Sequence, residues 1–276
     1  MILPDDFRFS QASLQDYVDC PRRFYLRYRL RLPWPAIETA PFLLQEEHAR
    51  QGRELHRMIQ QHLLGVPVER LTIQPETPDL ERWWDHYRAH PLADLPSDRR
   101  PEFQLSAPLG DSRLLAKYDL LAIEPGARYV IVDWKTALRL PNRDDLIDRL
   151  QTRVYRFLLV HAGNAINSGA PVYPEEVQMR YWFAEFPEDT IVIDYSQEQY
   201  QIDGDYLLDL VEEIGRRAED EFHKTEQKQR CVYCRYRSLC ERGAKAGEWL
   251  PGDPAIPEMD LNELNLNFDD LPEVAL

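Results

Sequence analysis

The four cysteines of this chain are very unevenly distributed. Cys231, Cys234 and Cys240 form a C-x2-C-x5-C cluster near the end of the sequence, and Cys20 stands alone about 210 residues earlier. In a chain without secretory features, C-x2-C spacing favours metal or redox chemistry over structural disulfides. We therefore expect all four thiols to meet at one metal centre, which would bring the two ends of the chain together.

Two kinds of centre use four cysteines: a tetrahedral zinc site and an iron–sulfur cluster. Zinc ribbons usually combine two C-x2-C pairs, and only one such pair is present here. The division into one and three cysteines is more typical of an iron–sulfur protein, so we favour a [4Fe–4S] cluster and keep zinc as the alternative. In both cases the expected role is structural.

The length of 276 residues suits one large domain, with or without an appendage. No segment approaches the roughly 18 apolar residues that a membrane span needs. The first residues also lack the basic-then-apolar order of a signal peptide. We expect a cytoplasmic protein that has no membrane partner.

The net charge of −15 argues at first against a nucleic-acid ligand, but the charge is uneven. Residues 247–276 contain eight acidic residues and no basic ones. This composition predicts an acidic, poorly ordered tail that follows a domain over residues 1–246.

The sign of the charge reverses around the cysteines. Five arginines and no acid lie between Cys20 and Arg31, and seven basic residues face two acidic ones over residues 222–245. Tyrosines interleave with these bases, which suits phosphate contact combined with base stacking. A solvated face with buried tyrosines is an equally good interpretation. The candidate nucleic-acid contacts are Arg22, Arg23, Arg235, Tyr236 and Arg237.

Hydrophobic periodicity predicts helices, then a sheet, then further helices. The expected helices span residues 13–30 (kinked at Pro21), 42–64, 79–88, 144–161 and 196–223, and the expected strands span 103–109, 113–123, 129–135, 177–186 and 190–194. Together they make one α/β domain with a central sheet flanked by helices.

An apolar strand ends in Asp133-Trp134-Lys135, and the strand period of two puts Asp133 and Lys135 on one face. Asp119 lies in the preceding strand among apolar residues, where a carboxylate is costly unless it is paired or metal-bound. Two such carboxylates repel each other unless a cation lies between them, and oxygen ligands suit Mg2+ or Mn2+. Lys135 could then activate water or offset charge on a phosphate. A plain Asp–Lys ion pair is the simpler alternative.

Some weaker candidates lie on helices. His56 follows Gly52 by one turn, and Gln151 and Tyr155 share one helix face. Taken singly, such residues are more often ordinary surface or core residues. Glu102 is a further carboxylate, too weakly placed to include in the site.

The order of these features resembles the PD-(D/E)XK nucleases, and specifically their RecB-like branch. Gly-x3-His on a helix, Asp on a strand, Asp-x-Lys on a strand and Gln-x3-Tyr on a helix follow one another. The segment Cys20-Pro21-Arg22-Arg23-Phe24, with the C-terminal cysteines, is similar to the [4Fe–4S] subset, which includes the AddB nuclease domain and the CRISPR-associated RecB-like exonucleases. The resemblance covers roughly residues 10–243. Ala116 is a mild departure, because the family often has Gly at this position.

The resemblance implies a restriction-endonuclease-like fold with a mixed sheet, and an iron–sulfur subdomain built from about residues 10–32 and 222–246. It also implies roles for individual residues. The metal ligands would be His56, Asp119, Asp133 and the carbonyl of Trp134, the catalytic lysine would be Lys135, and the supporting pair would be Gln151 and Tyr155.

The function expected from this resemblance is that of a Mg2+- or Mn2+-dependent DNA nuclease, acting as an exonuclease on single-stranded DNA. CRISPR adaptation and DNA repair or recombination are the two competing settings. The sequence shows no helicase motif, so a partner protein would have to unwind duplex DNA. Two alternatives come from other functional classes: a non-catalytic iron–sulfur protein that binds nucleic acid, and a zinc-ribbon adaptor whose tail recruits partners.

Overall fold

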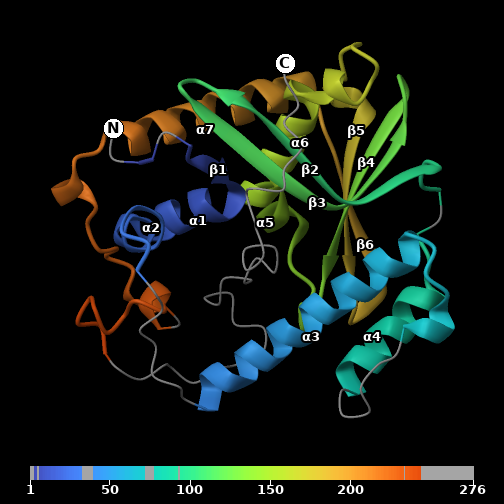
Figure 1. Cartoon of the computed structure of the whole chain (residues 1–276), viewed down its shortest axis with the longest axis horizontal. Helices are drawn as coiled ribbons and strands as arrows, with labels where there is room; N and C mark the ends of the chain where they lie inside the picture. The colour runs from blue at the N-terminus through green and yellow to red at the C-terminus, as the bar shows by residue number, and fades with distance from the viewer. Residues whose placement is uncertain are drawn as a thin grey trace.

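Figure 1 shows the computed structural model of the chain. The structure describes residues 3–4, 6–32, 40–71, 78–92, 94–232 and 234–243, and for residues 40–46 it describes the main chain only. The predicted acidic tail at residues 247–276 lies outside the described residues, so its order stays a prediction.

A mixed six-stranded sheet forms the centre of the fold. Its strands are β1 (Arg8–Ser10), β2 (Asp98–Leu109), β3 (Ser112–Glu124), β4 (Arg128–Lys135), β5 (Val177–Phe183) and β6 (Phe186–Asp194). The strand order is β1-β3-β4-β5-β6, and β2 pairs with β3. The pairs β1–β3 and β4–β5 are parallel, and the others are antiparallel.

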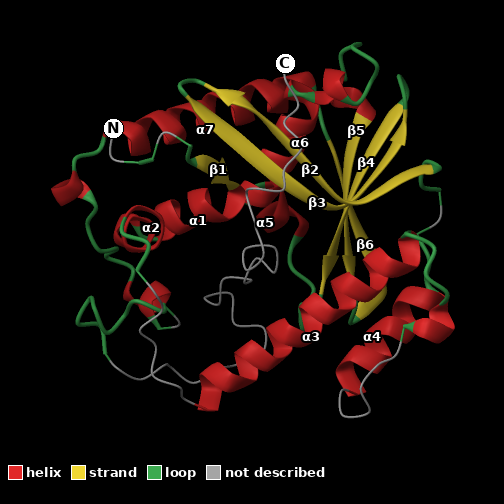
Figure 2. Ribbon diagram, viewed as in Figure 1, coloured by secondary structure: helices red, strands yellow, loops and turns green. Residues whose placement is uncertain are grey.

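Helices cover both faces of this sheet (Figure 2). The main helices are α1 (Gln11–Asp19), α2 (Pro21–Phe24), α3 (Ala40–Leu63), α4 (Pro78–Ala89), α5 (Arg143–Ile147), α6 (Leu150–His161) and α7 (Gln197–Arg216). A larger apolar cluster joins the sheet to α1, α6 and α7, and a smaller cluster joins its other face to α3 and α4. The predicted mixed α/β fold with a helix-flanked central sheet is confirmed. None of the described helices is both long and apolar enough to cross a membrane.

Strand β3 shares one of its edges between two neighbours. Leu114 pairs with β1 and β2, whereas Ile123 pairs with β4 and β2. Strands β1 and β4 therefore lie along the same edge of β3. The β3–β4 ladder stops at Leu120 and Val132, so the two strands diverge beyond these residues. On its β3 side, the main chain of β4 beyond Val132 is therefore left open to side chains, while its other edge stays paired with β5.

The β2–β3 hairpin is irregular at this same place. Tyr118 and Leu121 belong to one apolar cluster, although residues three apart in a regular strand point to opposite faces. The alternation therefore shifts between them, at Asp119. Glu102, which the register places opposite Asp119, has a left-handed φ of 54°. This distortion lets both carboxylates turn toward the opening between β3 and β4.

Two of the predicted helices are broken. The helix predicted over residues 13–30 stops at Asp19, and Cys20 is extended (ψ 104°) before α2 starts at Pro21 and runs into a π-helical turn at Tyr25–Arg29. Pro21 cannot donate a main-chain hydrogen bond, so it can start a helix but not continue one. The helix predicted over 144–161 is interrupted between α5 and α6, because Arg149 is extended (ψ 139°).

The last helix is shorter than predicted. It ends at Arg216 rather than near residue 223, because Arg217 adopts an extended conformation with ψ of 134°. The chain then turns so that Phe222 packs on Phe24 and Tyr25, with ring centroids 6.1 and 5.3 Å apart. A continued helix would carry Phe222 away from this aromatic contact.

Candidate active site

His56 of α3 reaches across the smaller apolar layer to the open end of β4. Its Nε2 lies 2.9 Å from the carbonyl oxygen of Trp134, and its Nδ1 lies 3.4 Å from Oδ1 of Asp119. The N–H of Trp134 donates to Oδ2 of Asp119 at 2.9 Å. Because the strand ladder has already stopped, both main-chain groups of Trp134 bind side chains instead of a neighbouring strand.

Asp133 and Lys135 point together to the other side of β4, as the strand period predicts. Lys135 Nζ lies 3.0 Å from Oδ2 of Asp133 and donates to Oε1 of Gln151 at 3.0 Å. Gln151, in the first turn of α6, donates through Nε2 to Oδ1 of Asp133 at 2.7 Å. The three side chains therefore form a closed triangle between β4 and α6.

The protonation of His56 follows from its partners. A carbonyl oxygen can only accept a hydrogen bond, so Nε2 carries a proton, and Nδ1 faces the carboxylate of Asp119. Burial disfavours the imidazolium, but the charges of Asp119, Asp133 and Glu102 outweigh burial and raise the pKa of His56 to about 9. The imidazolium thus holds positive charge among the carboxylates.

The pKa values of the three carboxyl groups shift in different directions. Burial would raise the pKa of Asp119, but His56 and the Trp134 N–H lower it below the usual range. Burial raises the pKa of Asp133 to about 7; Asp119 adds to this and Lys135 opposes it. Burial and the Asp119 charge also raise the pKa of Glu102. Three carboxyl groups therefore lie close together at this site, and two of them keep a proton more readily than an ordinary carboxyl group does.

The residues fit a divalent cation. His56, Glu102 and Asp119 offer ligand atoms that all lie within 4.8 Å of one another. Buried Oδ2 of Asp133 and Nδ1 of His56 make no hydrogen bond with the described residues, although each has a charged neighbour. Clustered carboxylate oxygens with an imidazole beside them suit Mg2+ or Mn2+. The resemblance implied Asp133 as the third side-chain ligand; the structure groups Glu102 there and turns Asp133 toward Lys135.

Glu102 is the functional candidate that sequence reasoning left out. It forms an ion pair with Lys117 on β3 and faces Asp119 across the hairpin. A signal was available in the sequence Gly110-Asp111, which is typical of a tight turn between two strands. A two-residue loop there pairs Leu109 with Ser112, and counting back along the hairpin brings position 102 opposite position 119.

Tyr155 lies one turn beyond Gln151 on α6 and packs against strand β3. Its ring is 2% exposed and packs on Tyr118 with centroids 5.1 Å apart. Its carbonyl accepts a hydrogen bond from the Tyr118 hydroxyl at 3.1 Å. Tyr155 therefore supports the segment of β3 that precedes Asp119.

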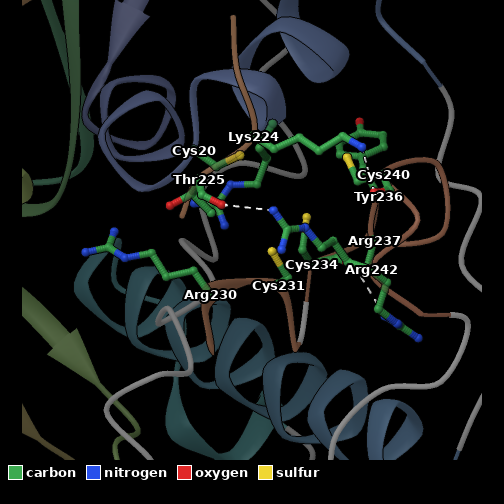
Figure 3. A pocket seen from close by; sticks show the side chains of 11 residues that line it. Cys20, Lys224, Thr225, Arg230, Cys231, Cys234, Tyr236, Arg237, Cys240 and Arg242 are labelled. Atoms are coloured by element: carbon green, nitrogen blue, oxygen red, sulfur yellow. Dashed lines mark hydrogen bonds between the residues drawn. The ribbon is translucent and has the colours of Figure 1, made fainter. Parts of the chain in front are cut away.

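The cysteines from both ends of the chain line one pocket (Figure 3). Cys20 lies at the break between α1 and α2, Cys231 ends the last described helical turn (Lys228–Cys231), and Cys234 and Cys240 follow it. Burial raises the pKa of Cys234 to about 11, and burial together with Cys20 raises the pKa values of Cys231 and Cys240. Basic residues also line the pocket: Arg23, Lys224, Arg230, Arg237 and Arg242.

Three of the five predicted nucleic-acid contacts are buried, which corrects that expectation. Arg23 (9% exposed) pairs with Asp16 and Asp19, Tyr236 (1%) donates to the carbonyl of Leu32, and Arg237 (3%) donates to the carbonyl of Cys234. A DNA phosphate cannot reach side chains held this way. The Tyr236 contact joins the cysteine segment to the chain that follows the N-terminal helices, whereas the contacts given for Arg23 and Arg237 lie within their own segments. The other two, Arg22 and Arg235, are half-buried, and Arg22 lies over the ring of Tyr25.

We compared the chain with protein families, curated proteins and solved structures. Residues 8–241 match the PD-(D/E)XK nuclease superfamily. No curated protein matches the chain. Among solved structures, a "putative exonuclease" from Eubacterium rectale is similar at a TM-score of 0.48 and 9% identity, over 81% of this chain and 85% of that one. The protein SSO0001 is similar at a TM-score of 0.34 and 13% identity, over 70% of this chain and 84% of that one. The superfamily match covers most of the sequence, including every residue of the site just described, and the chain therefore belongs to the PD-(D/E)XK nuclease superfamily.

Proposed function

We propose that this nuclease is a Mg2+- or Mn2+-dependent deoxyribonuclease of the RecB-like branch that degrades single-stranded DNA from its ends. One observation carries most of the support. His56 and Asp119 bind the two main-chain groups of Trp134, directly beside the triangle of Asp133, Lys135 and Gln151. A non-catalytic binding protein would have no need for buried carboxylates arranged around one strand end.

The cation would be held by His56, Asp119 and the Trp134 carbonyl, with Glu102 and Asp133 on either side. When bound, it would polarise the phosphate and lower the pKa of a bound water. The carboxylates already place oxygen ligands close together in a largely buried site, and His56 adds a ring nitrogen beside them.

Lys135 would stabilise the charge that builds up on the phosphate during hydrolysis. Its side chain is 15% exposed, so it can meet a substrate while Gln151 and Asp133 hold its ammonium in place. In the reaction the oxygen of water forms a bond to phosphorus, one P–O ester bond breaks, and the leaving oxygen takes up a proton. Gln151 contacts both ends of the Asp133–Lys135 pair and would keep their separation fixed.

We propose a [4Fe–4S] cluster for the four cysteines, ahead of zinc. A single zinc ion with Zn–S bonds of about 2.3 Å requires thiolates roughly 4 Å apart. Among the described residues, which include all four cysteines, no three cysteine sulfurs lie within 4.8 Å of one another. A cluster of four iron atoms separates its thiolates more widely than a single ion does. The basic lining of the pocket would offset the negative charge of such a cluster.

CRISPR adaptation and DNA repair or recombination both require trimming of single-stranded ends, and we propose that the protein works in one of these settings. A partner would then supply any unwinding of duplex DNA. The acidic tail is a candidate contact for such a partner.

A cleavage assay tests the nuclease proposal. Linear and circular single-stranded DNA, duplex DNA and single-stranded RNA would each be incubated with Mn2+, with Mg2+ and with a chelator. We expect metal-dependent loss of linear single-stranded DNA and intact circles. Cutting of circles as fast as linear strands would reject the requirement for ends, and preferred cutting of RNA would reject the DNA assignment.

Metal analysis of anaerobically purified protein tests the cluster. We expect about four iron and four sulfide ions per chain. One zinc ion per chain without sulfide would reject the cluster and favour the adaptor alternative for this subdomain.

A further inference from the structure

We propose that Tyr181 is a positioning residue for Lys135. Its aromatic ring holds the Lys135 ammonium, and its hydroxyl connects strand β5 to helix α6. The inference rests on the catalytic role proposed for Lys135. Tyr181 lies 46 positions further along the chain and carries no chemistry that sequence motifs would single out.

The register of the sheet puts Tyr181 under the site. Strands β4 and β5 run in parallel side by side, and Asp133 pairs directly with Tyr181. The aromatic ring is fully buried, at 0% exposure, and Lys135 Nζ lies 5.7 Å from its centroid. This separation is within reach of a cation–π contact, which is stronger when the cation is largely shielded from water.

The hydroxyl of Tyr181 makes a second connection. It lies 2.7 Å from Oγ1 of Thr152, and Thr152 itself donates to the carbonyl of Leu146. Because the single hydroxyl proton of Thr152 is used there, Tyr181 must be the donor in the Tyr181–Thr152 bond. Thr152 directly follows Gln151, so the bond anchors the first turn of α6 to the strand below it.

Together these contacts surround the Lys135 ammonium. Lys135 contacts Asp133, Gln151 and the ring of Tyr181, and Tyr181 in turn fixes the residue next to Gln151. Any cation that engages Asp133 competes with Lys135 for that carboxylate. Gln151 and the ring face then remain as the groups that keep the ammonium at the phosphate, and this is why a ring is needed at position 181.

The decisive experiment changes the ring's charge distribution without changing its shape. Tyr181→Phe would be compared with phenylalanines carrying one, two and three fluorine atoms at the same position, because each fluorine weakens the negative ring face. We expect log kcat to fall steadily along the series, by between about tenfold and 100-fold in total, with unchanged KM for DNA and unchanged Mn2+ affinity. Equal kcat across the series would overturn the inference.

Simple substitutions separate the ring from the hydroxyl. Tyr181→Phe removes the tie to α6 and keeps the ring, so it should cost far less activity than Tyr181→Leu. Tyr129→Leu is the matched control, because Tyr129 is also fully buried on the sheet and has a hydrogen-bonded hydroxyl. An equal loss of kcat in folded Tyr129→Leu and Tyr181→Leu would reduce Tyr181 to a packing residue.

One further variant keeps the two proposals apart. If Lys135→Gln cleaves DNA like the wild type, the role proposed for Lys135 is wrong, whatever happens at Tyr181. If Lys135→Gln is inactive while the fluorinated series shows no trend, only the inference about Tyr181 is wrong.

Discussion

Binding of a divalent cation should drive a proton off His56, and the site determines how large this effect is. In the metal-free protein Asp119, 3.4 Å away, helps to raise the pKa of His56 to about 9 despite its burial. At pH 7 the imidazole is therefore almost fully protonated. Freeing one ring nitrogen for a metal then costs about 2.7 kcal/mol, because each pKa unit corresponds to about 1.36 kcal/mol. This weakens metal binding by roughly 100-fold.

The sign of the pH dependence follows directly. Protons compete with the cation for His56, so raising the pH strengthens binding until the pKa is passed. Between pH 7 and pH 8.5 the affinity for Mn2+ should rise by roughly twentyfold, and by about twice that if Asp133, with its pKa of about 7, must also ionise.

Titration calorimetry measures both quantities. The heat of Mn2+ binding in buffers of different ionisation enthalpy gives the number of protons released, which should be about one to 1.5 at pH 7. In the His56→Gln variant the affinity should be low and the pH dependence above pH 7.5 should disappear. A wild-type affinity that stays flat from pH 7 to 8.5, with no proton release, would refute the charged state of His56 and its pairing with Asp119.

Three further outcomes are expected. Asp133→Asn should abolish cleavage, and wild-type cleavage by this variant would contradict the site. At pH 8 the metal-free variant should nevertheless melt at the same temperature as the metal-free wild type or at a higher one. The reason is that the folded-state pKa of Asp133 (about 7) exceeds its unfolded value, so the wild type loses stability as the pH rises toward 7. Cys20→Ser should lose iron and lower the free energy of unfolding by roughly 5 kcal/mol. This is the value that a loop-entropy model built for disulfides gives for a link across about 210 residues. Unchanged iron content would show that Cys20 does not belong to the centre. Deleting residues 247–276 should tighten single-stranded DNA binding at low salt, with a gain that shrinks as salt rises, if the tail competes with DNA phosphates; weaker binding after deletion would reject that competition.

The features that the sequence determined by itself are local ones. The apolar strand that ends in Asp133-Trp134-Lys135 needs only its own period of two to place Asp133 and Lys135 on one face. Likewise, the sequence alone places Gln151 on a helix with strong periodicity and His56 on a long helix. Such patterns depend on neighbours within a few residues, and the sequence contains all of those neighbours.

Composition could not decide whether the basic side chains near the cysteines would face solvent or the interior. Arg23, Tyr236 and Arg237 have the character of a nucleic-acid surface, but the folded chain buries all three, and Tyr236 finds its partner in a distant segment. A segment rich in basic and aromatic residues has the same composition whether its side chains face solvent or pair with buried acids such as Asp16. Only the packing of the two chain ends distinguishes these cases.

The remaining parts of the site depend on pairing between distant strands. Glu102 joins His56 and Asp119 because of the register and distortion of the β2–β3 hairpin, and Tyr181 lies beneath Lys135 because β5 pairs with β4 in parallel. A shift of one residue in either register would turn these side chains to the other face. The sequence by itself determined the chemical groups on each strand, and the tertiary structure alone decided which of them meet.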